Sequence, residues 1–210
     1  MAQDAGRGSG APRRKVSTLP ANFSGAALTR LGEQASQRAE QVNGELAALT
    51  YGALVRQLVV DYEDPGEVNV QLERLGYNIG LRLADDFLAR SGAPPCRRFV
   101  ETSEVIARVA FRMYLGVSAR VASVAEDGSA YSVVFEENPL ADFVEMPTAL
   151  RDQLWFSNLL CGAIRGALEM VQYVVSVSFV RDVLRGDAYN EIRVALREQR
   201  YERAPPDEEL

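Results

Sequence analysis

The sequence predicts an α+β domain in which helices pack on an antiparallel sheet. Two observations lead to this class. Long segments carry apolar residues at helical spacing, and two pairs of shorter segments alternate apolar with polar residues. The segments follow one another in the order ααα-ββ-α-ββ. This order is typical of α+β domains, because the helices and the hairpins are grouped along the chain.

The first half of the chain predicts three helices, over residues 45–62, 67–90 and 100–115. The first is apolar on two sides, so it needs two partners to cover it, of which one is its own core; a helix at the centre of the core is the alternative. The second contains Gly76 and Gly80, one turn apart. Each glycine costs about 1 kcal/mol relative to alanine inside a helix. This cost indicates that another backbone approaches closely there, and two merely tolerated glycines are the alternative.

The second half predicts two hairpins separated by a buried helix. Residues 118–138 alternate and turn near Gly128. Residues 154–171 are apolar over most of the helical circumference, which is typical of a central helix. Two further strands, about 175–179 and 191–197, are joined by a segment containing Arg-Gly-Asp. We interpret that tripeptide as the turn of the hairpin and not as an integrin-binding site.

Composition limits the functions that are open to the chain. Its 210 residues are 47% hydrophobic and 25% charged, which suits one soluble globular domain. A net charge of -6 argues against general nucleic-acid binding. The absence of histidine excludes Ser-His and Cys-His dyads, and two separated cysteines cannot build a zinc site. We therefore expect no metal, no cofactor of an ordinary enzyme and no catalytic residues.

The chain is expected to have three parts. Residues 1–44 predict an N-terminal extension, disordered to partly helical; residues 45–201 predict one domain; residues 202–210 predict a flexible acidic tail. No apolar run of about 18 residues and no signal-peptide core are visible in the sequence. With only two cysteines, a reducing, cytoplasmic compartment is the natural expectation.

Several stretches resemble one known family. The strings are "LTYGALVRQLVVDYED", "YNIGLRLADDFLAR", "NPLADFVE" and "LWFSNLLCGAIRGALEMVQ". From about Glu45 to about Arg200, the chain resembles the small subunits of the transport protein particle (TRAPP) complex, of the subunit 3 type. The resemblance implies a bundle of about four to five helices packed on one side of a twisted four-stranded antiparallel sheet. It also implies a scaffold subunit of a vesicle-tethering complex that exchanges guanine nucleotide on an early-secretory Rab GTPase. Membrane contact would be peripheral, at cis-Golgi and ER-Golgi membranes.

The resemblance further implies a palmitoyl chain in thioester linkage to Cys96. We expect Arg97 and Arg98 to lower the pKa of this thiol, because only a thiolate attacks an acyl thioester. We also expect Pro94 and Pro95 to stiffen the loop. The family usually has a basic residue where this chain has Pro95. An unmodified loop thiol is the alternative for Cys96. The other cysteine, Cys161, is expected to be an inert buried thiol.

Two sets of residues complete the predicted site. By the resemblance, Ala110 lies at the wall of an acyl channel; helical facing adds further candidates, which are Leu54, Leu58, Val109, Met113 and Leu168. The resemblance also implies a homodimer, or a heterodimer with a related small subunit, formed through the first two helices of the domain. The interface candidates are Val55, Leu58, Val59, Tyr62, Gly76 and Gly80.

Two other functions stay open at this point. The chain could be a lipid or acyl carrier with an exchangeable ligand, or an acyltransferase that depends on Cys96. The second is weak because the sequence offers no histidine as a base.

Overall fold

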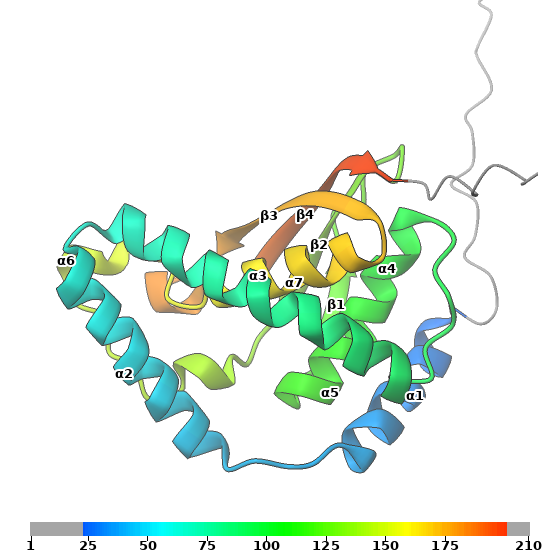
Figure 1. Cartoon of the computed structure of the whole chain (residues 1–210), viewed down its shortest axis with the longest axis horizontal. Coiled ribbons are helices and arrows are strands. Elements are labelled where there is room, and N and C mark those ends of the chain that lie inside the picture. Colours follow the sequence, from blue (N-terminus) through cyan, green and yellow to red (C-terminus); the bar gives the residue numbers. More distant parts are fainter. Residues whose placement is uncertain (1–22, 201–210) are drawn as a thin grey trace, which may run out of the picture.

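The computed structural model describes residues 23–200 and contains one four-stranded antiparallel sheet with helices on one face (Figure 1). The strands are β1 (Ala119–Ala122), β2 (Ala130–Phe135), β3 (Tyr173–Arg181) and β4 (Asn190–Gln199), in the spatial order β1-β2-β4-β3. The α+β class and the four-stranded sheet predicted from the sequence are confirmed.

The alternation along the strands explains why only one face of the sheet meets the helices. In the central pair, Tyr131 lies opposite Val194 and Val133 lies opposite Ile192, and all four side chains are buried in the main core. The neighbouring positions, Ser132 opposite Arg193 for example, point to the other face. Because side chains alternate with a period of two, the apolar residues gather on the face that the helices cover.

The central contact of the helical layer joins α3 (Pro65–Arg90) to α7 (Leu159–Met170), which lie side by side (Figure 1). A Cβ atom on Gly76 would lie 2.0 Å from the carbonyl oxygen of Leu159, and one on Gly80 would lie 2.2 Å from that of Ala163. A Cβ on Gly162 would lie 2.0 Å from the carbonyl oxygen of Glu73. The close backbone approach that these glycines predict is therefore present, and it is internal to the chain.

Helix α7 begins at Leu159, five residues later than the sequence predicts. The side chain of Asn69 on α3 accounts for the difference. Its Oδ1 accepts a hydrogen bond from the backbone N–H of Trp155 (2.8 Å), and its Nδ2 donates to the carbonyl of Gln153 (2.8 Å). Asn69 thus satisfies one backbone N–H and one backbone carbonyl of the segment before α7, in place of helical bonds at these two groups.

Helix α1 (Gly25–Arg38) packs against the middle of the third predicted helix. That helix is α4 (Phe99–Val105), a π-helical turn η2 (Ile106–Ala110) and α5 (Phe111–Leu115), which ends at Gly116 with φ 73°. The assignment of residues up to 44 to an extension is corrected for α1, because Leu28 is buried against Val105 and Val109. The expectations for residues 1–22 and 202–210 lie outside the described residues.

Helix α2 (Gly44–Tyr62) begins at its cap Asn43 and stands at one side of the molecule (Figure 1). Its inner side holds Tyr51 and Val55 in a second core cluster, whose other buried members are Val68, Leu72, Met146, Leu154 and Phe156. In this cluster the Tyr51 hydroxyl donates to the carbonyl of Phe156 (2.5 Å). Most of its other side chains are exposed. The short elements that remain are α6 (Thr148–Arg151) and the 3-10 turns Pro139–Ala141 and Val183–Arg185.

Candidate functional site

An apolar cavity of about 430 Å³ lies between α3, the α4–α5 segment and α7. This volume falls within the roughly 300–1,000 Å³ that small-molecule sites occupy. Cys96 and Ala93 lie at the loop that joins α3 to α4, while Leu140 and Leu159 line the part of the wall next to the second core cluster. The remaining walls carry aliphatic and aromatic side chains, which include Leu83, Phe87, Ile106, Phe111, Ile164 and Leu168.

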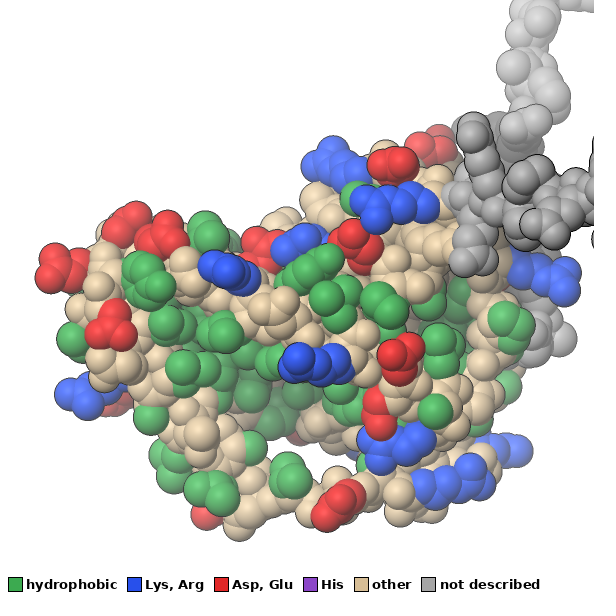
Figure 2. Space-filling view, in the orientation of Figure 1, with side chains coloured by type: hydrophobic (Ala, Val, Ile, Leu, Met, Phe, Trp, Pro, Cys, Tyr) green, Lys and Arg blue, Asp and Glu red, His purple; other side chains and the backbone are tan. Residues whose placement is uncertain are grey.

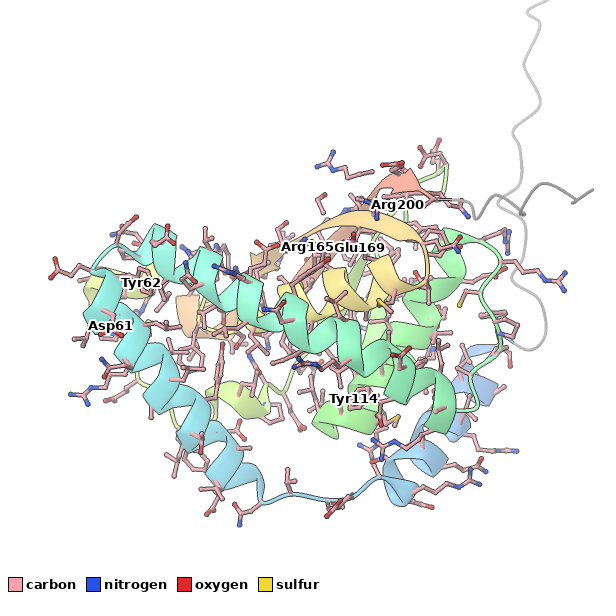
Figure 3. The ribbon with its side chains drawn as sticks, viewed as in Figure 1. Asp61, Tyr62, Tyr114, Arg165, Glu169 and Arg200 are labelled. Carbon is pink, nitrogen blue, oxygen red and sulfur yellow. The ribbon has the colours of Figure 1, made fainter. Side chains whose placement is uncertain are left out.

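The few polar groups on the wall are engaged with protein atoms. The Thr102 hydroxyl lies 2.6 Å from the carbonyl oxygen of Phe99, to which it donates, and 2.8 Å from the hydroxyl of the buried Tyr131. The Tyr114 hydroxyl reaches from α5 to α3, where it donates to Asp86 (2.8 Å) (Figure 3). Burial raises the pKa of Tyr114 above its ordinary value, and the hydrogen bond to the Asp86 carboxylate adds to the rise. The cavity therefore suits an apolar occupant.

Cys96 lines this cavity and is partly buried. Burial, together with a smaller effect of the nearby negative charge of Glu101, raises the pKa of its thiol to about 12. The prediction that Arg97 and Arg98 lower this pKa is therefore wrong. The guanidinium of Arg98 instead pairs with Glu101, with 2.9 Å between Nε and Oε1, and the side chain of Arg97 is exposed. At neutral pH the thiol is protonated.

Glu101 is a buried carboxylate beside the cysteine that the sequence reasoning missed. It accepts hydrogen bonds at Oε2 from the backbone N–H groups of Arg97 (2.7 Å) and Arg98 (3.2 Å). Burial acts to raise the pKa of Glu101, but the hydrogen bonds from the Arg98 side chain and from the two N–H groups outweigh it and hold this pKa below its ordinary value. The available signal was a glutamate at the third position of a helix, where it often caps the first turn.

The structure places the predicted channel residues in different surroundings. Ala110 and Leu168 lie on the cavity wall. Val109 instead faces α1 beside Leu28, and Met113 is buried outside the cavity lining. Leu54 and Leu58 are on α2, where Leu54 is 41% exposed and Leu58 packs on the second core cluster. The assignment of Val109, Met113, Leu54 and Leu58 to the channel wall is thus corrected.

The predicted interface residues also separate into two groups. Gly76 and Gly80 are covered by α7, and Val55 is buried in the second core cluster, so these three are unavailable to another chain and are corrected. Leu58 and Val59 are half-buried. Tyr62 is 42% exposed at the end of α2 (Figure 3).

An apolar surface nevertheless runs over α2 and α3. Figure 2 shows hydrophobic side chains gathered on both helices and in the recess between them. Large exposed apolar residues of these two helices include the six that we call the α2–α3 face, which are Leu46, Leu49, Leu54, Val60, Leu75 and Ile79. Ile79 also lines the cavity, so this surface and the interior site are neighbours.

Two further properties concern residues 23–200. None of the helices there combines the length and apolar character needed to cross a bilayer. In the same part of the chain, no three His, Cys, Asp or Glu side chains gather as ligands for a metal ion.

The chain is similar in sequence to a known family and to several of its members. The model of the family described as "Transport protein particle (TRAPP) component" matches residues 47–195. The chain is 47% identical over 183 residues to the transport protein particle subunit bet3 of Schizosaccharomyces pombe, covering 86% of this chain and 98% of that one. It is 50% identical over 169 residues to the trafficking protein particle complex subunit 3 of Dictyostelium discoideum, covering 80% and 91%.

A solved structure is similar as well. It is the trafficking protein particle complex subunit 3 from Naegleria fowleri, covalently bound to palmitic acid. The two chains are 49% identical and superpose with a TM-score of 0.75, over 78% of this chain and 100% of that one.

Proposed function

Because the chain belongs to the TRAPP component family, as a member of the subunit 3 type, we propose that it is a scaffold subunit of a vesicle-tethering complex and carries a palmitoyl chain on Cys96. The observation that carries the acyl proposal is the apolar cavity of about 430 Å³ with this thiol in its wall. The palmitic acid bound covalently to the Naegleria fowleri relative supports the choice of ligand.

The acyl chain would stabilise the domain from within. Burying hydrocarbon contributes about 0.8 kcal/mol per methylene, so a palmitoyl chain contributes at most roughly 10 kcal/mol before the cost of ordering it. A chain held inside the protein cannot anchor the protein in a bilayer. Acylation in this site is therefore structural, and any contact with membranes is peripheral.

Mass spectrometry of the protein isolated from its own cells tests this proposal. We expect one palmitoyl adduct on Cys96 that hydroxylamine removes and that Cys96→Ser lacks. Lipid that is released by denaturation and exchanges with added lipid would favour an acyl carrier instead. Catalytic turnover of an acyl donor that is lost in Cys96→Ser would favour an acyltransferase. A cavity that never holds lipid in the native protein would refute the acyl proposal and the acyl-carrier alternative.

The assembly role rests on the α2–α3 face. An exposed apolar surface of this kind is typical of protein interfaces, and we propose that it pairs with a related small subunit of the complex or with a second copy. Leu58, Val59 and Tyr62 on α2 keep part of their surface accessible, and we include them in the proposed contact. Within the assembled complex the subunit would contribute to guanine-nucleotide exchange on an early-secretory Rab GTPase at cis-Golgi and ER-Golgi membranes.

Purification of the tagged chain from its own cells tests the assembly role. We expect other subunits of the complex to co-purify, and the purified assembly to accelerate nucleotide release from the Rab. A chain that is isolated alone under gentle conditions would contradict the scaffold role.

A further inference from the structure

The loop that carries Cys96 is fastened at both of its ends. At the α3 end, the backbone N–H of Ala93 donates to the hydroxyl oxygen of the buried Ser91 (3.1 Å). At the α4 end, the carboxylate of Glu101 accepts two hydrogen bonds from the backbone at Arg97 and Arg98. Between these points lie two prolines, whose φ angles are restricted by their rings. The position of the cysteine is therefore set by its fastened neighbours.

The hydrogen bonds that Glu101 accepts are unusual for a partly exposed loop. The residue is only 2% exposed, although it is a carboxylate. Its Oε2 accepts a hydrogen bond from the backbone N–H of Arg97, the residue directly after Cys96. Its Oε1 accepts one from Nε of the Arg98 guanidinium, at 2.9 Å. Hydrogen bonds to an ionised carboxylate are shorter and stronger than those between neutral groups. Through these hydrogen bonds, the buried carboxylate of Glu101 connects the loop to the first turn of α4.

We infer that Glu101 is the positioning residue of the thioester site: it holds the backbone after Cys96 so that the sulfur stays in the cavity wall. This inference rests on the proposed acylation of Cys96 and deepens it. Glu101 does not itself line the cavity. It acts through the peptide groups of residues 97 and 98 and touches neither the acyl chain nor the reacting atoms.

Position matters for the chemistry of the site. The Cys96 thiolate attacks the carbonyl carbon of a long-chain acyl thioester, a sulfur–carbon bond forms to Cys96, and the donor's sulfur–carbon bond breaks. The donor leaves as a thiolate and takes up the proton that the cysteine gave to solvent. The apolar chain can enter the cavity only if the carbonyl is presented at its wall. A sulfur displaced toward solvent would meet the donor in the wrong place.

The test uses the full chain, freed of thioester by hydroxylamine, with palmitoyl-coenzyme A as the donor and intact mass as the readout. Glu101→Ala should acylate about 10- to 100-fold more slowly than the parent, because displacing a reacting group by about 1 Å has effects of this size. Glu101→Gln keeps an oxygen that accepts both peptide N–H groups, so it should restore at least most of the parent's rate. Cys96→Ser should take up no acyl chain.

Ser103→Ala is the matched control. Ser103 is buried in the same helical turn, and its hydroxyl donates to the carbonyl of Val100 (2.6 Å) rather than to Glu101. This variant should lose stability and keep the parent's acylation rate. A Glu101→Ala rate equal to that of the parent would overturn the inference. So would a Ser103→Ala rate as low as that of Glu101→Ala, because helix stability alone would then explain the loss.

A second readout separates this inference from the proposed function. A charged maleimide should label Cys96 at least several-fold faster in Glu101→Ala than in Glu101→Gln, although both variants have lost the carboxylate charge. Peptide mass distinguishes Cys96 from Cys161, which is fully buried. If the parent takes up no acyl chain while labelling behaves as expected, the acylation proposal fails and the positioning role stands. If the parent acylates but neither readout responds to Glu101→Ala, only the positioning role fails.

Discussion

At the scale of single residues, the chemistry of Cys96 follows from burial rather than from its arginine neighbours. Two adjacent guanidinium groups in the sequence suggest a reactive thiolate, but one of them is neutralised by Glu101 and the other side chain is exposed. A buried thiol with a pKa of about 12 is a poor nucleophile at pH 7. Such a site suits a bond that forms slowly, once, and then persists.

The pH dependence of the deacylated thiol should reflect this environment. Burial disfavours the charged form, so the thiolate fraction should rise about tenfold for each pH unit until the pH approaches about 12. We expect the rate of alkylation at Cys96, followed by peptide mass, to keep rising through at least pH 10. N-acetylcysteine, measured beside it, should level off near its ordinary pKa of about 8.5. A protein rate that levels off with the small thiol would show that the sulfur is solvated.

Ala110 allows a second test at this scale, because its small side chain forms part of the cavity wall. Ala110→Leu adds three carbon atoms to that wall and should prevent stable entry of the acyl chain. We expect the adduct fraction, measured by intact mass after identical expression, to fall by at least several-fold. Ala89→Leu, which places the same change on the exposed side of α3, is the control. An undiminished adduct in Ala110→Leu would remove Ala110 from the acyl site.

At the scale of elements, small residues decide which helices meet. The contact between α3 and α7 exists because glycines on both helices let carbonyl oxygens approach to distances that a Cβ atom would prevent. A similar close approach of backbones joins α1 to the segment formed by α4, η2 and α5. A Cβ on Gly32 would lie 2.2 Å from the carbonyl oxygen of Arg108. Helix α1 thus belongs to the domain through a specific backbone contact, even though its own sequence is weakly apolar.

Gly32→Ala should therefore destabilise the domain. The added methyl group meets backbone and not a flexible side chain, so α1 must shift outward, at a cost of about 1–3 kcal/mol. Chemical denaturation checks this as a lower midpoint. Gly44→Ala, at a helical position with open space around it, is the matched control and should be neutral or slightly stabilising. Equal midpoints for Gly32→Ala and the parent would mean that α1 is not held at this contact.

At the scale of the whole molecule, the cavity and the α2–α3 face are neighbouring features of one scaffold. The cavity is lined by apolar side chains inside the domain, and the α2–α3 face consists of apolar side chains on its outside. Leu140 and Leu159 belong both to the cavity lining and to the cluster that holds the inner side of α2. The interior therefore supports the inner side of α2, while the outer side of this helix is exposed.

Leu49→Glu should weaken pairing without unfolding the chain, because Leu49 is 58% exposed on α2. A charge placed in an apolar interface is left desolvated and unpaired, which costs several kcal/mol or forces the partners apart. Sedimentation analysis should show a lower mass for this variant at a concentration where the parent is paired. Val180→Glu makes the same change on β3, where Val180 is 50% exposed, and should leave the mass unchanged. Equal masses for Leu49→Glu and the parent would exclude this face as the interface.

The sequence by itself determined the class, the order of the elements and the family. Periodicity needs only local spacing, so the alternation at Val175 and Ile192 and the turn at Gly116 could be predicted from neighbours along the chain. Tertiary structure decided which surface each residue meets. The glycines at 76 and 80 signal a close backbone approach, but only the fold shows that α7 of the same chain makes it. Likewise, only the tertiary structure shows that burial raises the pKa of the Cys96 thiol and that Glu101 accepts a hydrogen bond from the backbone N–H of Arg97. These outcomes depend on contacts between residues that are distant in sequence, or on solvent exclusion that no local pattern encodes.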